Sequence, residues 1–166
     1  IIMGLNKPLI FLLSYLVGSI PTGYIIARAK GINILEHGSG NPGATNVYRI
    51  LGPKLGILTF IVDLLKGFIP VYFVNRIYSD PYLTIFTGIS AITGHVFSVF
   101  MNFRGGKGVA TSTGVFLAIL PYAVIISAAV FFILVKTSKI VSLSSLISAL
   151  IFFVISLIAD VRTEIK

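Results

Sequence analysis

The sequence contains no cysteine and no tryptophan, and only five acidic residues stand against thirteen basic ones. The lack of cysteine excludes disulfides, thiolate metal ligands and a cysteine nucleophile. With so few carboxylates we expect no catalysis by a carboxylate pair, and no cluster of His, Asp and Glu has the spacing of metal ligands. A Gly-x-Ser-x-Gly nucleophile elbow is also missing. Any reaction should therefore use an already activated substrate, with the protein supplying position and charge stabilisation.

Charge of either sign is scarce in these 166 residues. Charged residues make up 11% of the chain, whereas a soluble domain carries about 25%. Hydrophobic residues reach 56%, and the mean hydropathy is +1.02. These values predict an integral membrane protein. The net charge of +8 does not indicate a nucleic-acid partner, because the basic residues form no stripe or arm and fall mostly between apolar runs.

Five apolar runs are candidates for membrane spans, which need about 20 mostly apolar residues each. The first run is interrupted by Gly18, Pro21 and Gly23, and the fourth contains Pro121. As one helix the fourth run would be about 42 Å long, against a hydrocarbon core of about 30 Å. It is therefore either one kinked span or two short ones. The five runs cover residues 9–27, 55–74, 83–100, 108–135 and 140–159.

The distribution of basic residues favours two short spans in the fourth run, and hence six spans with the N-terminus outside. Lys66 falls within a span. The predicted fold class is an all-α integral membrane protein, a polytopic helical bundle forming a single domain over residues 1–166. On this topology the inside loops hold Arg28, Lys30, Arg49, Lys54, Arg104, Lys107, Lys136 and Lys139, and the outside segments hold Lys7, Arg76, Arg162 and Lys166.

The stretch "GSGNPGATN", residues 38–46, is too polar and too rich in glycine to pack like its neighbours. Glycine adopts positive φ easily, so backbone amides here can turn toward a common point and bind an anion. A plain membrane-surface turn around Pro-Gly is an equally good interpretation of the composition. If the loop binds phosphate, its candidate residues are Gly38, Ser39, Gly40, Asn41, Gly43, Thr45, Asn46 and the following Arg49.

A second glycine-rich stretch, "RGGKG" at residues 104–108, lies on the same predicted cytoplasmic side and precedes a predicted helix. Two cations, flexible backbone and a helix N-terminus suit a phosphate. The stretch does not meet the Walker A pattern. Taken alone, it is better explained as topology-setting cations with a flexible turn.

Ionisable residues within the apolar runs are candidates for function. Asp63 and Lys66 are three residues apart on one predicted helix, so they can form an ion pair, which is at least as good an explanation as a functional role. His95 could bond a substrate or transfer a proton, although an interhelical hydrogen bond is slightly favoured. The hydroxyl residues of the runs are expected mostly at helix contacts: Ser19, Thr22, Thr111, Ser112, Thr113, Ser142, Ser144 and Ser145.

Six stretches, in this order and spacing, closely resemble the bacterial acyl-phosphate:glycerol-3-phosphate acyltransferases. They are "GSIPTGYIIA" (18–27), "GSGNPGATNVYR" (38–49), "DLLKG" (63–67), "GHVFSVF" (94–100), "GGKGVAT" (105–111) and "VSLSSL" (141–146). The resemblance implies a multi-pass protein of the bacterial inner membrane with seven helices and a site facing the cytoplasm. It implies transfer of a fatty acyl group from acyl phosphate to the 1-hydroxyl of glycerol 3-phosphate. The product would be lysophosphatidic acid, which starts phospholipid synthesis.

The resemblance also implies partners and roles. Family members use no metal, no cofactor and no acyl-CoA, and form no acyl-enzyme, so the expected partners are the two substrates, the lipid bilayer and an enzyme that produces acyl phosphate. We predict Ser39, His95 and Lys107 as catalytic residues. Residues 38–49 would bind one phosphate, and Gly105, Gly106 and Lys107 the other. Ser142, from the last matching stretch, is added to the substrate-binding set.

Two departures from the family pattern stand out. Ser98 follows "GHVF" where the family usually has proline. The chain stops at "ADVRTEIK", so we expect it to lack the family's last helix. An alternative function is a transporter or channel for a small phosphorylated solute, which cationic loops and broken helices also suit.

Overall fold

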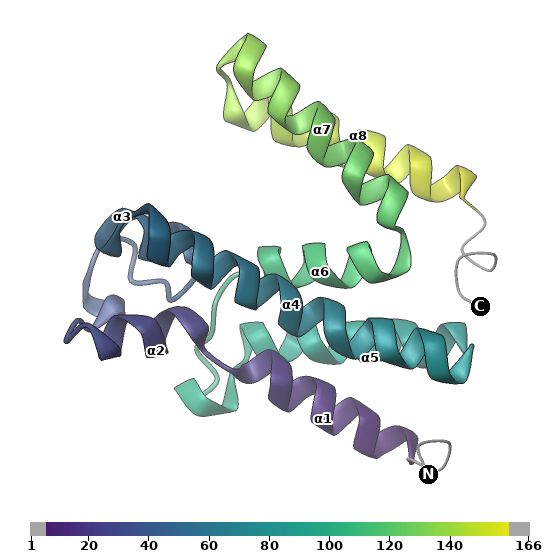
Figure 1. Ribbon diagram of the computed structural model, residues 1–166, viewed down its shortest axis with the longest axis horizontal. Helices are drawn as coiled ribbons and strands as arrows, with labels where there is room; N and C mark the ends of the chain where they lie inside the picture. The colour runs from purple at the N-terminus through teal and green to yellow at the C-terminus, as the bar shows by residue number, and fades with distance from the viewer. Residues whose placement is uncertain (1–5, 160–166) are drawn as a thin grey trace.

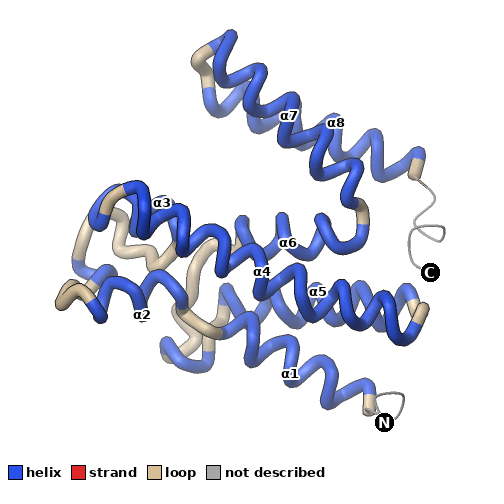
Figure 2. Tube along the Cα trace, in the orientation of Figure 1, coloured by secondary structure: helices blue, strands red, loops and turns tan. Residues whose placement is uncertain are grey.

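The computed structural model describes residues 6–159, and these residues are helical without a strand (Figures 1 and 2). The predicted all-α membrane fold is confirmed. Two short 3-10 turns, η2 (Ile34–Glu36) and η3 (Val99–Met101), lie in the loops. The α-helices of this part of the chain are α1 (Lys7–Ser19), α2 (Thr22–Ala29), α3 (Ala44–Leu51), α4 (Pro53–Tyr78), α5 (Pro81–Val96), α6 (Val109–Ile119), α7 (Pro121–Ser138) and α8 (Val141–Ile158).

Within the described residues, four helical stretches are long and apolar enough to cross a membrane, and two shorter apolar helices accompany them. The four are Lys7–Ala29, which joins α1 and α2, then α4, Pro81–Met101 and α7. The run 108–135 does divide into two helices, α6 and α7, because Pro121 starts a new helix after Leu120. A total of six spans stays a prediction, and the outside residues Arg162 and Lys166 lie beyond the described part.

The first span is broken between Ser19 and Thr22, as expected from the position of Pro21. Side chains from other helices bond to the carbonyl groups at this break. Lys66 Nζ on α4 donates to the Ile20 carbonyl at 2.8 Å, and Ser98 Oγ, after α5, donates to the Ser19 carbonyl at 2.5 Å. The break is therefore held by polar contacts inside the bundle.

Helix pairs that are distant in sequence form the body of the protein. Helix α1 packs along α5, and α4 packs along α6. The α1–α5 approach is close: a Cβ on Gly18 would collide with the backbone of Ala91, and one on Gly94 with the Tyr15 carbonyl. Helices α7 and α8 form a hairpin that extends away from the body beyond α6 (Figure 1), and Phe152 of α8 contacts Phe116 of α6. Small residues thus set the closest contacts, as expected in a membrane bundle.

Candidate functional site

A cavity of about 280 Å³ lies where the two glycine-rich loops meet. The first loop and the start of α3 line one side, and Lys107 and the start of α6 line another. Phe60 and Asp63 of α4 and His95 of α5 complete the wall. The predicted association of the two loops is thus found in the structure. Of the predicted site residues, the cavity is lined by Ser39, Asn41, Gly43, Thr45, Asn46, Arg49, His95 and Lys107.

The amides of the first loop are largely used within the loop. The Ser39 N–H donates to Asn46 Oδ1 at 3.0 Å, the Gly43 N–H to Asn41 Oδ1 at 2.9 Å, and the Gly40 N–H to the His37 carbonyl at 3.1 Å. The predicted cradle of free amides over residues 38–43 is therefore wrong for these three donors. Gly38 and Gly40, with φ of 61° and 66°, shape the loop and are not among the lining residues.

Asn46 holds this loop together. Its side chain is buried, accepts from the Ser39 amide, and donates to the carbonyls of His37 at 2.9 Å and Ile34 at 3.4 Å. An amide group engaged in three such bonds has little left for a ligand. Asn46 therefore organises the loop, and the exposed side chains of Ser39, Thr45 and Arg49 line the cavity.

Two helices begin at the cavity. Helix α3 starts at Ala44 after Gly43, and α6 starts at Val109 after Gly108, whose φ is 78°. Neither N-cap residue caps its helix with a side chain. The first-turn amides of a helix lack partners inside that helix and favour an anion. With Arg49 and Lys107 on the same cavity, the arrangement suits anionic groups such as phosphates.

The second loop is tied to the end of α5. The Gly105 N–H donates to the Val96 carbonyl at 2.9 Å, and the Gly106 N–H to the His95 carbonyl at 3.0 Å. A Cβ on Gly105 would collide with the His95 carbonyl, and one on Gly106 with His95 Nε2. These two glycines therefore allow the loop to lie against α5, and their amides are not available to a phosphate. This corrects their predicted binding role, and Lys107 is the cation that the loop brings to the cavity.

Ser142 is not brought to the cavity. It lies exposed in the first turn of α8, in the hairpin that packs mainly on α7. Residues 141–146 come after α7 has left the body of the protein, so their position depends on the hairpin rather than on the two loops. Ser142 is not among the residues that line the cavity in this structure, so its substrate-binding role stays a prediction.

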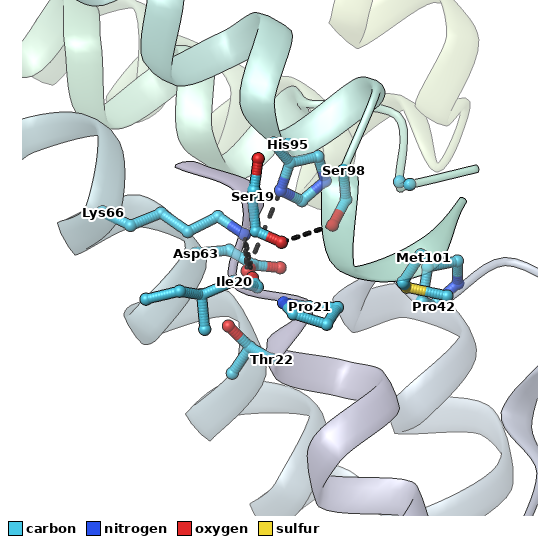
Figure 3. A pocket seen from close by; sticks show the side chains of 12 residues that line it. Ser19, Ile20, Pro21, Thr22, Pro42, Asp63, Lys66, His95, Ser98 and Met101 are labelled. Carbon is cyan, nitrogen blue, oxygen red and sulfur yellow. Dashed lines mark hydrogen bonds and ion pairs between the residues drawn. The ribbon is translucent and has the colours of Figure 1, made fainter. Parts of the chain in front are cut away.

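A buried polar cluster of Asp63, Lys66 and His95 lies between the α1–α2 break and α5 (Figure 3). Lys66 Nζ is 2.8 Å from Asp63 Oδ1, and both side chains are almost fully buried, so the predicted ion pair is confirmed. His95 Nδ1 is 3.9 Å from the same carboxylate oxygen. A small cavity of about 10 Å³ is lined by Asp63, Lys66 and His95 together with Ser19, Thr22 and Ser98. Asp63 and His95 line both cavities, so the cluster adjoins the anion site.

Thr111 also belongs to this cluster, although the sequence predicted only a helix contact for it. Its hydroxyl is fully buried, 3.0 Å from the Asp63 carbonyl oxygen and 3.1 Å from His95 Nδ1. The interhelical hydrogen bond expected for His95 is thus present. Its partner on α6 could not be identified from spacing, because the two residues belong to different helices.

Comparison with known proteins gives a consistent result. A family model described as Glycerol-3-phosphate acyltransferase matches residues 8–165. A glycerol-3-phosphate acyltransferase of Geobacter sulfurreducens is 47% identical over 146 residues, which cover 87% of this chain and 75% of that protein. One of Fusobacterium nucleatum is 47% identical over 141 residues, covering 82% and 71%.

Solved structures also match. The crystal structure of PlsY, an integral membrane glycerol 3-phosphate acyltransferase, in its glycerol 3-phosphate form is 39% identical with a TM-score of 0.84, covering 95% of this chain and 80% of that one. Its lysophosphatidic acid form has a TM-score of 0.82 at the same identity, covering 95% and 79%.

Proposed function

The chain belongs to the glycerol-3-phosphate acyltransferase family, and on this premise we propose that it transfers a fatty acyl group from an acyl phosphate to the 1-hydroxyl of glycerol 3-phosphate. The hydroxyl oxygen attacks the acyl carbonyl carbon, the bond from that carbon to the phosphate oxygen breaks, and inorganic phosphate leaves. The hydroxyl proton passes to a phosphate of the substrates. The products are lysophosphatidic acid and phosphate.

The observation that carries this proposal is that one cavity has a cation on each of two sides. Both substrates contain a phosphate, and the cavity offers Arg49 with the start of α3 on one side and Lys107 with the start of α6 on the other. Asp63 also lines the cavity, but its charge is paired with Lys66. The lining therefore carries net positive charge, which suits two anionic ligands.

We assign roles according to these positions. Ser39, Asn41, Thr45 and Arg49 bind one phosphate. Lys107 and the first amides of α6 bind the other and stabilise the charge that develops as the bond to the leaving phosphate breaks. His95 also lines the cavity, and it orients the attacking hydroxyl before the hydroxyl proton passes to a substrate phosphate. An acyl phosphate is a mixed anhydride with a good leaving group, so positioning and charge stabilisation are sufficient and no protein nucleophile is needed.

The setting follows from the same premise. We place the protein in the bacterial inner membrane as a multi-pass, single-domain protein with the cavity facing the cytoplasm, because the basic residues of both loops lie on the side that the positive-inside rule assigns to the cytoplasm. An enzyme that produces acyl phosphate supplies the donor. The acyl tail lies in the lipid-like surroundings of the helices.

The test is an assay of the protein in lipid vesicles with labelled glycerol 3-phosphate and a choice of acyl donors. We expect labelled lysophosphatidic acid with acyl phosphate and none with acyl-CoA. Lys107→Ala should lower turnover on the order of 10²-fold, as for loss of one charge-stabilising donor. Lys136→Ala, an exposed cation of α7 that does not line the cavity, is the matched control and should retain turnover.

Two results would overturn the proposal. One is movement of glycerol 3-phosphate across the vesicle membrane without any acylated product, which would identify a transporter. The other is full turnover by Lys107→Ala, which would remove the second loop from the site.

A further inference from the structure

The hydrogen bonds of Thr111 determine which ring nitrogen of His95 carries the proton. We propose that Thr111 is a positioning residue that holds neutral His95 with its proton on Nδ1, leaving a lone pair on Nε2. The inference concerns the tautomer of the ring. Its consequence for turnover rests on the proposed function of His95.

The Thr111 hydroxyl has a single proton to donate. Thr111 Oγ1 lies 3.0 Å from the Asp63 carbonyl oxygen, which can only accept a hydrogen bond, so the hydroxyl donates there. Were the proton directed to His95 instead, two oxygen lone pairs would face each other at 3.0 Å. With its proton used, Oγ1 can only accept at its second contact, His95 Nδ1 at 3.1 Å. Nδ1 must therefore be the donor.

The carboxylate of Asp63 favours the same tautomer. Asp63 Oδ1 is 3.9 Å from His95 Nδ1, and a carboxylate attracts an N–H more than a bare ring nitrogen. Lys66 pairs with this carboxylate at 2.8 Å and keeps it in place. Asp63 therefore acts twice on the ring, through its backbone carbonyl by way of Thr111 and through its side-chain charge.

Helix packing explains why Thr111 can reach this position. Helix α6 lies so close to α4 that a Cβ on Gly67 would collide with the Thr111 carbonyl oxygen. Thr111 is fully buried in this contact, so its hydroxyl has no water to bond. On the other edge of the ring, Nε2 faces Gly106, where a Cβ would collide with it. The ring is thus held at Nδ1 by Thr111, and its Nε2 lies close to the backbone of Gly106.

The tautomer decides what His95 offers to a ligand. With the proton on Nδ1, Nε2 accepts a hydrogen bond from a donor such as a substrate hydroxyl. With the proton on Nε2, it would donate instead to the hydroxyl oxygen and engage a lone pair that is needed for attack. Outer partners that fix a metal-ligating histidine are worth about 10–100-fold in affinity or activity, and we expect an effect of the same order here.

The tautomer can be measured directly by nitrogen NMR of ring-¹⁵N-histidine protein in lipid nanodiscs at mildly alkaline pH, where imidazole is neutral. The chain contains two histidines, and His37→Gln leaves His95 as the only signal. We expect a protonated Nδ1 and a bare Nε2, whose resonance lies well downfield. A protonated Nε2, or two averaged signals, would overturn the proposal without any need for a Thr111 variant.

Two variants of Thr111 test whether this residue holds the tautomer of His95. Thr111→Val has nearly the same shape but no hydroxyl, and should move the proton of His95 to Nε2 or average the two tautomers. Thr111→Ser keeps the hydroxyl and should keep the protonated Nδ1. An unchanged spectrum in the valine variant would show that Thr111 does not hold the tautomer.

Turnover separates this inference from the proposed function. We expect Thr111→Val to lower kcat by about 10–100-fold with little change in KM for glycerol 3-phosphate, since the cations that bind phosphate are untouched, and Thr111→Ser to restore it. If the spectra behave as expected but His95→Gln retains full turnover, the tautomer assignment stands and the role of His95 in the reaction fails.

Discussion

Replacement of Lys66 by methionine should destabilise the protein strongly, because it removes the partner of a buried carboxylate. Lys66 Nζ lies 2.8 Å from Asp63 Oδ1 and also donates to the Ile20 carbonyl at 2.8 Å. The exposed fractions of the two charged side chains are 6% and 3%, so water cannot compensate the loss. Breaking a buried ion pair by removing one partner costs about 3–5 kcal/mol. We expect Lys66→Met to lower the free energy of unfolding by this amount.

The assay is equilibrium unfolding in mixed micelles with increasing denaturing detergent, followed by far-UV circular dichroism, because the protein lacks tryptophan and is helical. The matched control is the double variant Asp63→Asn/Lys66→Met. It removes both charges, and replacing a whole buried pair is often neutral or stabilising. The double variant should therefore regain most of the stability that Lys66→Met loses.

Two outcomes would refute this reasoning. If Lys66→Met unfolds at the same denaturant concentration as the unchanged protein, the pair does not contribute to stability. If the double variant is as unstable as Lys66→Met, the loss comes from the bond to the Ile20 carbonyl or from packing rather than from the stranded carboxylate. In either case the buried position of Asp63 beside His95 would not depend on its ion pair with Lys66.

Three further predictions follow from single contacts. Gly18→Ala should cost about 1–3 kcal/mol of unfolding free energy by overpacking the α1–α5 contact, and wild-type stability would contradict that contact. Ser98→Ala should cost about 1–3 kcal/mol by leaving the Ser19 carbonyl without its donor. Ser98→Pro should cost less than Ser98→Ala, because φ at this position is −63° and proline stiffens the unfolded chain. Equilibrium unfolding of the two variants compares their free energies of unfolding. Lys7 and the Leu83 amide lower the pKa of Asp80. Its stabilising effect should therefore be present above pH about 4 and be lost as the pH falls through the lowered value, so the difference in melting temperature between Asp80→Asn and the unchanged protein should vanish in acid.

The breaks in the helices could be predicted from sequence because their causes are local. Pro21 and Pro121 end one helix and begin the next wherever the chain is placed, since a proline donates no backbone hydrogen bond and fixes its own φ. The Asp63–Lys66 pair was predictable for the same reason, because residues three apart share a helix face.

The use of the loop amides could not be predicted, because their partners are distant or depend on one side chain. Glycine content indicates that amides can point together, but not that Gly105 and Gly106 spend theirs on carbonyls of α5, or that Asn46 takes the Ser39 amide. The predicted set of amide donors is therefore partly wrong. The cations Arg49 and Lys107 and the hydroxyl residues Ser39 and Thr45 line the cavity, and several glycines allow close packing instead.

The buried cluster shows how hydrogen-bond partners could be predicted more closely from the sequence of a membrane protein. Within an apolar span an unpaired polar group is costly, so Asp63, Lys66, His95 and Thr111 must bond to something inside the protein. The ion pair satisfies two of them locally, and the remaining imidazole and hydroxyl then need partners from other helices. His95 and Thr111 each lie next to a cytoplasmic loop on the predicted topology, so their depth in the membrane matches. Pairing polar residues of equal depth would have pointed from His95 to Thr111, the contact on which the tautomer of His95 depends.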